Sequence, residues 1–221
     1  MRDHPFTTRR RLLVAAGALG VVATGLGGSV ESALAQSTTS VDELMAPEAL
    51  PDVVLGSKDA PVTMVEYASM TCSHCARFHA ETYPTLKSKY IDTGKVRFIL
   101  REFPLDPLAA LGFMLARCSG TDDKRTALVD LMFDQQKNWA FVDKPIQALS
   151  DLVKQAGFTQ DSFDACMQNK DLYDKINQVR DRAAEKFGVD ATPTFFINGK
   201  KQAGEITVDE LEKMLDPLVK S

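Results

Sequence analysis

Positive charge is in short supply in this sequence. The 221 residues contain 26 Lys and Arg against 30 Asp and Glu, for a formal charge of −4. Without residues 1–35 the balance is 22 against 28, or −6, and no cluster of basic side chains remains. Proteins that bind nucleic acids neutralise phosphates with clustered Lys and Arg, so we do not expect DNA or RNA as a partner.

Potential metal ligands are also few. There are four Cys and three His, with one C-x-x-C motif, no second C-x-x-C and no H-x-H. A structural zinc site needs four ligands, and a catalytic one needs three with an open position. We therefore predict no metal and no cofactor. Internal repeats are missing as well, and residues 36–51 show no heptads that would support oligomerisation, so we expect a monomer.

The one long apolar run lies at the N-terminus. Three arginines at positions 9–11 precede an uncharged segment from residue 12 to residue 30, and the small-x-small sequence at 32–35 suits signal peptidase. The arginines resemble a twin-arginine signal, although an ordinary secretory signal fits too. An uncleaved membrane anchor is the alternative, but five glycines make the run weakly hydrophobic. We predict a cleaved signal peptide over residues 1–35 and a periplasmic protein.

The rest of the chain predicts an α/β fold. Residues 36–51 are interpreted as a short leader. β-branched and apolar runs predict strands at 62–69 and 96–103, with a helix between them that Pro84 should kink. Residues 106–187 show only helical patterns.

The C-terminal part returns to strands. "TFFI" and "KKQAG" flank Asn198-Gly199, which is a strong hairpin signal. A capping box from Thr207 to Glu210 opens a final amphipathic helix. The order is therefore β-α-β, a helical block, then β-β-α. A parallel strand pair and an antiparallel hairpin can share one mixed sheet with helices on its faces.

The chemistry is concentrated in "SMTCSHCARFH", residues 69–79. Cys72 follows a strand and begins a helix, where unpaired N–H groups and the helix dipole favour an anion. Its pKa should therefore fall well below the usual ~8.5. His74 can add a hydrogen bond or a positive charge, and Cys75, one turn later, should be more enclosed. In an exported protein these features favour dithiol–disulfide chemistry. A metal or copper site that adds His74 or His79, or two inert thiols, are the alternatives.

"CSHC" after a strand, a helical block and then "GVDATPTFFINGK" resemble the DsbA-like thiol–disulfide oxidoreductases of the thioredoxin superfamily, from about Asp52 to Ser221. The resemblance implies a thioredoxin-like fold over residues 52–105 and 188–221, with an inserted all-helical domain at 106–187. It also implies a protein that introduces disulfides into exported proteins with free cysteines. A quinone-linked, DsbB-like membrane protein would reoxidise it. A disulfide isomerase or reductase kept reduced by another partner is the alternative within the same chemistry.

The resemblance also implies roles for single residues. Ser73 departs from the family pattern, where the best-known members have Pro. The matching positions are Cys72 as the reacting cysteine, Cys75 as its partner, His74 as the histidine of the C-P-H-C signature, Glu66 as a buried acid thought to move protons to and from Cys75, and Pro193 as a cis-proline preceded by Thr192.

For several of these positions an alternative interpretation involves no function. Glu66 would lie half-exposed at the end of its strand, and Pro193 would be trans, as most X–Pro bonds are. His79 is expected to be an ordinary polar position on its helix. Cys118 and Cys166 are predicted to form a structural disulfide, because some DsbA-like proteins resemble this chain in having a second cysteine pair in the helical block. Two buried free thiols are the alternative.

Overall fold

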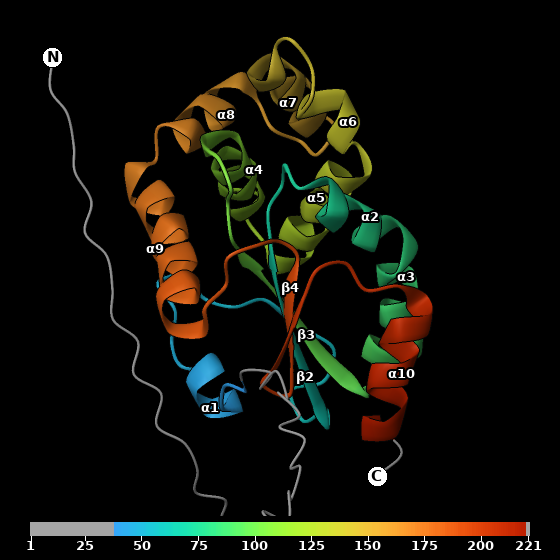
Figure 1. Ribbon diagram of the computed structural model, residues 1–221. Coiled ribbons are helices and arrows are strands. Elements are labelled where there is room, and N and C mark those ends of the chain that lie inside the picture. Colours follow the sequence, from blue (N-terminus) through green and yellow to red (C-terminus); the bar gives the residue numbers. More distant parts are fainter. Residues whose placement is uncertain (1–37, 220–221) are drawn as a thin grey trace, which may run out of the picture. The chain divides into compact units, whose positions relative to one another are not determined.

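The computed structural model describes residues 38–219, and the predicted signal peptide lies outside the described residues. Figure 1 shows one mixed sheet between two layers of helices. Its order is β1-β3-β2-β4-β5; β2 runs parallel to β3, and every other neighbouring pair is antiparallel. The strands are β1 (Val54–Leu55), β2 (Val62–Ala68), β3 (Val96–Glu102), β4 (Thr194–Ile197) and β5 (Lys200–Ala203). The predicted α/β fold with a mixed sheet is confirmed.

The helices occur in the order that the sequence predicts. Asp106 and Thr121 cap α4 and α5 with their side chains, and Gly188 ends α9 with a φ of 62°. The helices are α1 (Val41–Leu44), α2 (Ser73–Glu81), α3 (Tyr83–Thr85), the π-helix η1 (Leu86–Ile91), α4 (Pro107–Arg117), α5 (Asp122–Asp134), α6 (Gln136–Trp139), α7 (Pro145–Lys154), α8 (Gln160–Met167), α9 (Lys170–Phe187) and α10 (Val208–Val219). None of these described helices is both long and apolar enough to cross a membrane.

Pro84 changes the helix after β2 more than a kink would. α2 ends at Glu81, Pro84 lies in the first turn of the short α3, and the π-helix η1 follows directly. Proline has no N–H to donate to the preceding turn, so the hydrogen-bond ladder restarts at this residue. The expected single kinked helix is therefore three consecutive segments.

The two faces of the sheet have separate cores, because successive strand residues point to opposite sides. On one face Met64, Phe98 and Phe195 pack with residues of α2, η1 and α10. On the other face Tyr67 and Phe196 pack with residues of α1 and α9. The last turns of α9, which the sequence assigned to the inserted helical block, thus cover the sheet.

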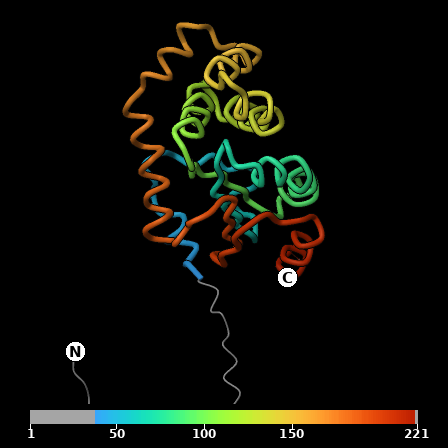
Figure 2. Tube along the Cα trace, turned by 45° about the horizontal axis from the view of Figure 1, so that its top comes forward, coloured from blue at the N-terminus to red at the C-terminus, as the bar shows by residue number. Residues whose placement is uncertain are grey.

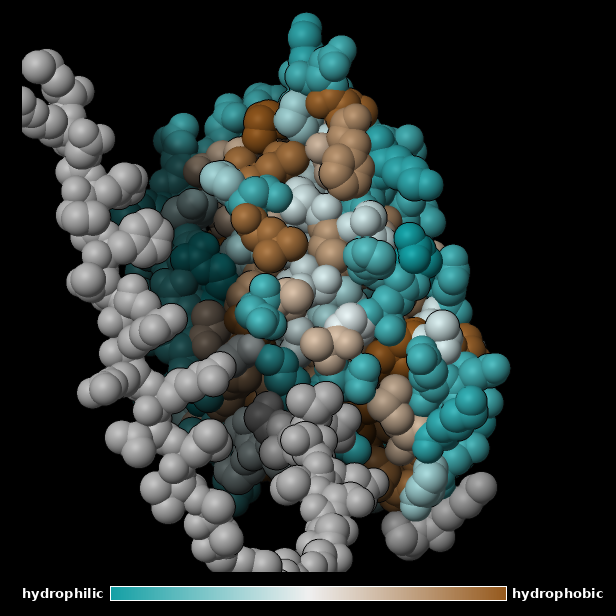
Figure 3. All heavy atoms as spheres, in the orientation of Figure 1, coloured by the Kyte–Doolittle hydropathy of each residue, from teal (hydrophilic) through white to brown (hydrophobic). Residues whose placement is uncertain are grey.

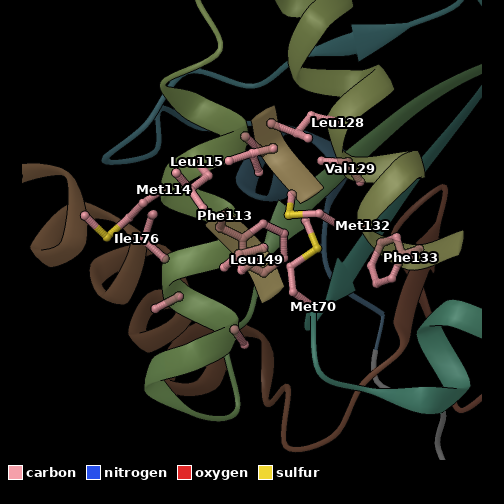
Figure 4. Close-up of a cluster of buried hydrophobic side chains, with 14 of the residues drawn as sticks. Met70, Phe113, Met114, Leu115, Leu128, Val129, Met132, Phe133, Leu149 and Ile176 are labelled. Atoms are coloured by element: carbon pink, nitrogen blue, oxygen red, sulfur yellow. The ribbon is translucent and has the colours of Figure 1, made fainter. Parts of the chain in front are cut away.

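A third core joins the helical block to the sheet. Figures 1 and 2 place α4 to α8 beyond the end of β2. Met70, which follows β2, points into the cluster formed by Phe113, Met132 and other residues of these helices (Figure 4). Cys75 belongs to the same cluster. The C-x-x-C segment therefore lies where the sheet and the helical block meet.

Part of the predicted leader forms a short helix that packs on the sheet. Residues 41–44 form α1, and Leu44 is fully buried against the sheet. Glu48 accepts a hydrogen bond from the buried Arg101 of β3 at 2.9 Å and also pairs with Arg182 of α9. The segment interpreted from the sequence as a short leader thus supplies both apolar and ionic contacts to the sheet. No local pattern predicts these contacts, because both arginines lie far along the chain.

Candidate active site

Cys72 is the N-cap residue of α2 and the fourth residue after the end of β2. Its backbone is extended (φ −81°, ψ 117°), and its Sγ accepts the N–H of Cys75 at 3.4 Å. In the thiol form Cys72 donates to the carbonyl oxygen of Thr192 at 3.2 Å. Cys72 is 8% exposed and Cys75 is fully buried. The strand thus ends and the helix begins so that one sulfur faces the surface and the other faces the core.

The surroundings shift the two thiols in opposite directions. The Cys75 thiol donates to Cys72, and together with the Thr192 side chain and the backbone N–H groups of Cys75 and His74 it outweighs burial and lowers the pKa of Cys72 to about 5. Burial, the neighbouring Cys72 and the charge of Glu66 raise the pKa of Cys75 well above its usual value. At neutral pH the reduced pair therefore holds one thiolate, at Cys72, and one thiol, at Cys75.

The loop before β4 lies opposite Cys72. The Thr192–Pro193 peptide bond is cis, and the Pro193 carbonyl accepts the N–H of Gly204 at 2.9 Å, which ties the loop to the end of β5. The Thr192 hydroxyl is buried and has no hydrogen-bond partner among the described residues. It is therefore available to donate to the thiolate form of Cys72, and in this way the Thr192 side chain lowers the pKa of Cys72.

His74 stabilises the Cys72 sulfur more through its backbone N–H group than through its ring. The side chain is 59% exposed, and Nδ1 lies 3.0 Å from a carboxylate oxygen of Glu205. Arg77 donates to the same oxygen at 3.0 Å. We expected the imidazole to support the Cys72 thiolate directly, but here the backbone N–H is the His74 group that stabilises it.

Glu66 is fully buried in β2, so the reading that places it half-exposed is wrong. Its Oε2 lies 3.0 Å from Nε2 of His79, and the His79 ring stacks on Phe133 with centroids 4.4 Å apart. His79 is 9% exposed, so the expectation of an ordinary polar position is wrong as well. The signal was present: a carboxylate inside an apolar strand needs a buried partner.

Gln136 is a site residue that the sequence did not reveal. It is buried in α6, and its side-chain amide donates to the carbonyls of Met70 and Cys72 at 2.8 and 3.0 Å. The helical block thereby fixes the turn that presents the reactive cysteine. A contact of this kind joins residues 64 positions apart, so no local pattern points to it.

The other two cysteines are joined to each other. Cys118, at the C-terminal end of α4, and Cys166, in the last turn of α8, form a disulfide with an S–S distance of 2.11 Å. For the metal alternative the geometry is unfavourable, because the rings of His74 and His79 are paired with Glu205 and Glu66. Within residues 38–219, no group of three or more His, Cys, Asp or Glu side chains is arranged to hold a metal ion.

Comparisons with known proteins agree with this arrangement. Residues 48–217 match the family described as Thioredoxin. A Rickettsia conorii protein named a protein-disulfide oxidoreductase is 34% identical over 165 residues, which are 75% of this chain and 59% of that protein. The chain thus spans about three fifths of the length of this relative.

Solved structures extend the comparison. The crystal structure of α-DsbA1 from Wolbachia pipientis is 33% identical, with a TM-score of 0.74, and the match covers 81% of this chain and 96% of that one. BdbD from Bacillus subtilis, at 22% identity and a TM-score of 0.65, shares the fold; the match covers 77% of this chain and 94% of that one. By sequence, by fold and by its C-x-x-C pair at the start of α2, the chain belongs to the DsbA-like thiol–disulfide oxidoreductases of the thioredoxin family.

Proposed function

We propose that this protein oxidises pairs of thiols in exported proteins through the Cys72–Cys75 couple. The observation that carries the proposal is the opposite shift of the two pKa values, to about 5 for Cys72 and well above the usual value for Cys75. A thiol with a low pKa is a good leaving group, and a disulfide whose reduced form is stabilised is a strong oxidant.

The reaction follows from these two groups. A substrate thiolate attacks Sγ of Cys72, a mixed disulfide forms, and the Cys72–Cys75 bond breaks. The electron pair stays on Cys75, which takes up a proton because its pKa lies far above neutrality. A second substrate thiol loses its proton and attacks the substrate sulfur of the mixed disulfide. Cys72 then departs as a thiolate, and the substrate has lost two electrons and gained a disulfide.

The size of the driving force follows from the shift at Cys72. Relative to a thiol with the ordinary pKa of 9.0, a pKa of about 5 stabilises the reduced form by about 3 kcal/mol at pH 7, since each factor of ten is worth ~1.4 kcal/mol. For a two-electron couple this is about 60 mV toward the oxidising side. The Cys75 thiol, the Thr192 side chain and the N–H groups at the helix start therefore supply oxidising power by stabilising the Cys72 thiolate.

Apolar surface beside the active site supports unfolded proteins as substrates. A groove that begins at Ser73, next to Cys72 in the chain, is lined by apolar side chains such as Phe141 and also by charged ones such as Arg77. Figure 3 shows hydrophobic atoms at the surface around α6 and α7, and Phe141, Val142 and Ile146 are exposed there. Folding chains expose apolar side chains, so contacts of low sequence specificity fit this surface.

The proposal places the protein in the periplasm, with residues 1–35 as its cleaved signal peptide. A DsbB-like, quinone-linked membrane protein would reoxidise the Cys72–Cys75 pair. The alternative is a reductase or isomerase that another donor keeps reduced. The two functions require different reduction potentials. The potential of thioredoxin, a reductase, lies near −270 mV, and that of DsbA, an oxidase, lies near −120 mV.

Equilibration with glutathione redox buffers distinguishes these functions. The fraction of protein with an oxidised Cys72–Cys75 pair is measured by alkylation and mass spectrometry, and a Cys118→Ala/Cys166→Ala variant removes the second pair from the signal. We expect a potential nearer to that of DsbA. A value at or below that of thioredoxin would refute the oxidase, and Cys72→Ser serves as the inactive control.

A further inference from the structure

A line of polar groups leads from the buried end of the active site toward solvent. Glu66 lies at the core end, and its Oε2 meets Nε2 of His79 at 3.0 Å. The other ring nitrogen, Nδ1, lies 3.8 Å from Oδ1 of Asp130 in α5. The side chains of Glu66, His79 and Asp130 are 0%, 5% and 45% exposed. Exposure thus rises along the line, and Asp130 reaches water.

Two atoms on this line are buried without a hydrogen-bond partner among the described residues. They are Oε1 of Glu66 and Nδ1 of His79. Unpaired buried polar atoms are rare in proteins and call for an explanation. A cavity of about 30 Å³ adjoins the outer end, lined by His79, Thr126 and Asp130 together with apolar side chains. This space is sufficient for a water molecule next to Nδ1.

The proposed reaction needs such a connection. Cys75 must gain a proton each time the disulfide is reduced and lose it each time the disulfide forms again. Cys75 is fully buried, however, and the charge of Glu66 acts on it directly. A buried acid alone would hold one proton and could not exchange it with water.

We propose that His79 and Asp130 form a proton relay that links Glu66, and through it Cys75, to solvent. The inference rests on the proposed function and adds two residues to its proton path. None of the described contacts joins His79 to the reacting sulfurs, so its part is to release and take up a proton at Nδ1 while its Nε2 stays hydrogen-bonded to Glu66. Asp130 or a water in the cavity receives that proton.

The proton balance is simple in the direction of disulfide formation. Cys75 gives its proton to Glu66, and His79 releases the proton on Nδ1 toward Asp130. The disulfide state then holds a protonated Glu66 beside a neutral His79 ring that keeps its proton on Nε2, so one proton has left the site for the one that Cys75 lost. Reduction of the disulfide runs the same path inward.

The charges around His79 suit this role. Burial lowers its pKa, but the carboxylates of Glu66 and Asp130 outweigh burial and raise the pKa of His79 to about 9. When Glu66 takes the proton from Cys75, one of these charges disappears, and the ring then releases its own proton more easily. Tyr83 of α3 and Arg125 of α5 also line the cavity; Arg125 is paired with Glu102.

The reaction of the reduced protein with oxidised glutathione tests the relay, because it separates two steps. First, the Cys72 thiolate attacks glutathione disulfide, forms an adduct with one glutathione and expels the other as a thiolate, without needing a proton from Cys75. Second, Cys75 loses its proton, attacks Sγ of Cys72 and expels glutathione as a thiolate. Rapid acid quench and mass spectrometry follow the adduct through both steps.

His79→Gln keeps a donor for Glu66 but removes the titrating ring, and Asp130→Asn keeps the shape of the outer end. We expect the second step to slow about tenfold in His79→Gln and about threefold in Asp130→Asn. Both factors are smaller than the roughly hundredfold that a general acid or base contributes at least, because neither residue contacts the reacting sulfur. The first step should keep its wild-type rate. Asp123→Asn, an exposed position two turns earlier on α5, removes the same charge and should change neither step.

Two results would overturn the relay. One is a wild-type second step in both variants, or in Asp130→Asn alone if His79→Gln does not fold. The other is an equal slowing of both steps, which would indicate a structural effect on the whole site. A different result would refute the proposed function itself. In that case Cys72 of the wild-type protein would attack glutathione disulfide no faster than an ordinary thiol does.

Discussion

The two cysteine pairs of this protein sit at opposite ends of helices. Cys72 is the N-cap of α2, whereas Cys118 is the C-cap of α4 and Cys166 lies in the last turn of α8. A helix N-terminus offers N–H groups and partial positive charge to a thiolate, and a C-terminus offers carbonyls and partial negative charge. The first pair is thereby prepared to exchange, since a stabilised thiolate leaves readily. The second has no such support and suits a lasting bridge.

Reduction rates should show the largest difference between the pairs. We expect the Cys72–Cys75 disulfide to react with dithiothreitol at least about a thousandfold faster than the Cys118–Cys166 disulfide, because only Cys72 leaves as a stabilised thiolate. Timed alkylation with mass mapping of each cysteine measures both rates in one sample. Similar rates for the two bonds would contradict the comparison.

Removal of the second bridge should affect stability and spare the chemistry. The bridge spans 48 residues, and in the chain-entropy model its loss costs roughly 4 kcal/mol. We expect Cys118→Ala/Cys166→Ala to lower the unfolding free energy by about this amount in urea titrations. The pKa of Cys72 should stay at its wild-type value; a rise of one unit would show that the two regions are coupled.

The Thr192 hydroxyl should contribute less, through a single hydrogen bond to the Cys72 thiolate. Thr192→Val keeps the size of the side chain and removes that donor. We expect the pKa of Cys72 to rise by about one unit, which corresponds to ~1.4 kcal/mol and a weaker oxidant. Thr194→Val, two residues further on, removes a hydroxyl that donates to Ala191 and serves as the matched control.

The ring of His74 should give the smallest effect. His74→Ser keeps the backbone N–H that stabilises Cys72, and the ring it removes is already paired with Glu205. We expect the pKa of Cys72 to rise by less than about one unit. Glu205→Gln should lower it slightly, because the ring and Arg77 lose their counter-charge. A fall in the pKa of Cys72 after His74→Ser would show that the ring does not favour the thiolate, which would contradict this interpretation.

The sequence predicted the parts of the fold whose signals are local. Strands β2 to β5, the caps at Asp106 and Thr121 and the hairpin at Asn198-Gly199 depend on residues within a few positions of one another. The positive φ angles of Asn198 and Gly199 are those that the hairpin turn requires. The reactive sulfur was predictable for the same reason, because it follows from one strand end and one helix start.

The features that the sequence missed depend on distant contacts. α1 is held by the sheet and by Arg101 and Arg182, and β1 has two residues and exists only as a partner of β3. The sequence predicts only an ordinary polar position for His79, because its burial depends on Glu66 in another element and on Phe133 in a third. A buried charge in a strand therefore calls for a search for its partner along the whole chain.

The central claim is tested most directly by titrating the Cys72 thiolate by its ultraviolet absorbance in reduced protein, with Cys72→Ser as the blank. Because the pKa is lowered from 9.0 to about 5, the thiolate should be present above pH 5 and lost as the pH falls through 5. The stability that it adds to the reduced protein, about 3 kcal/mol at pH 7, should fall to near zero between pH 7 and pH 5. A midpoint near 9, with no loss of stability between pH 7 and pH 5, would contradict the account.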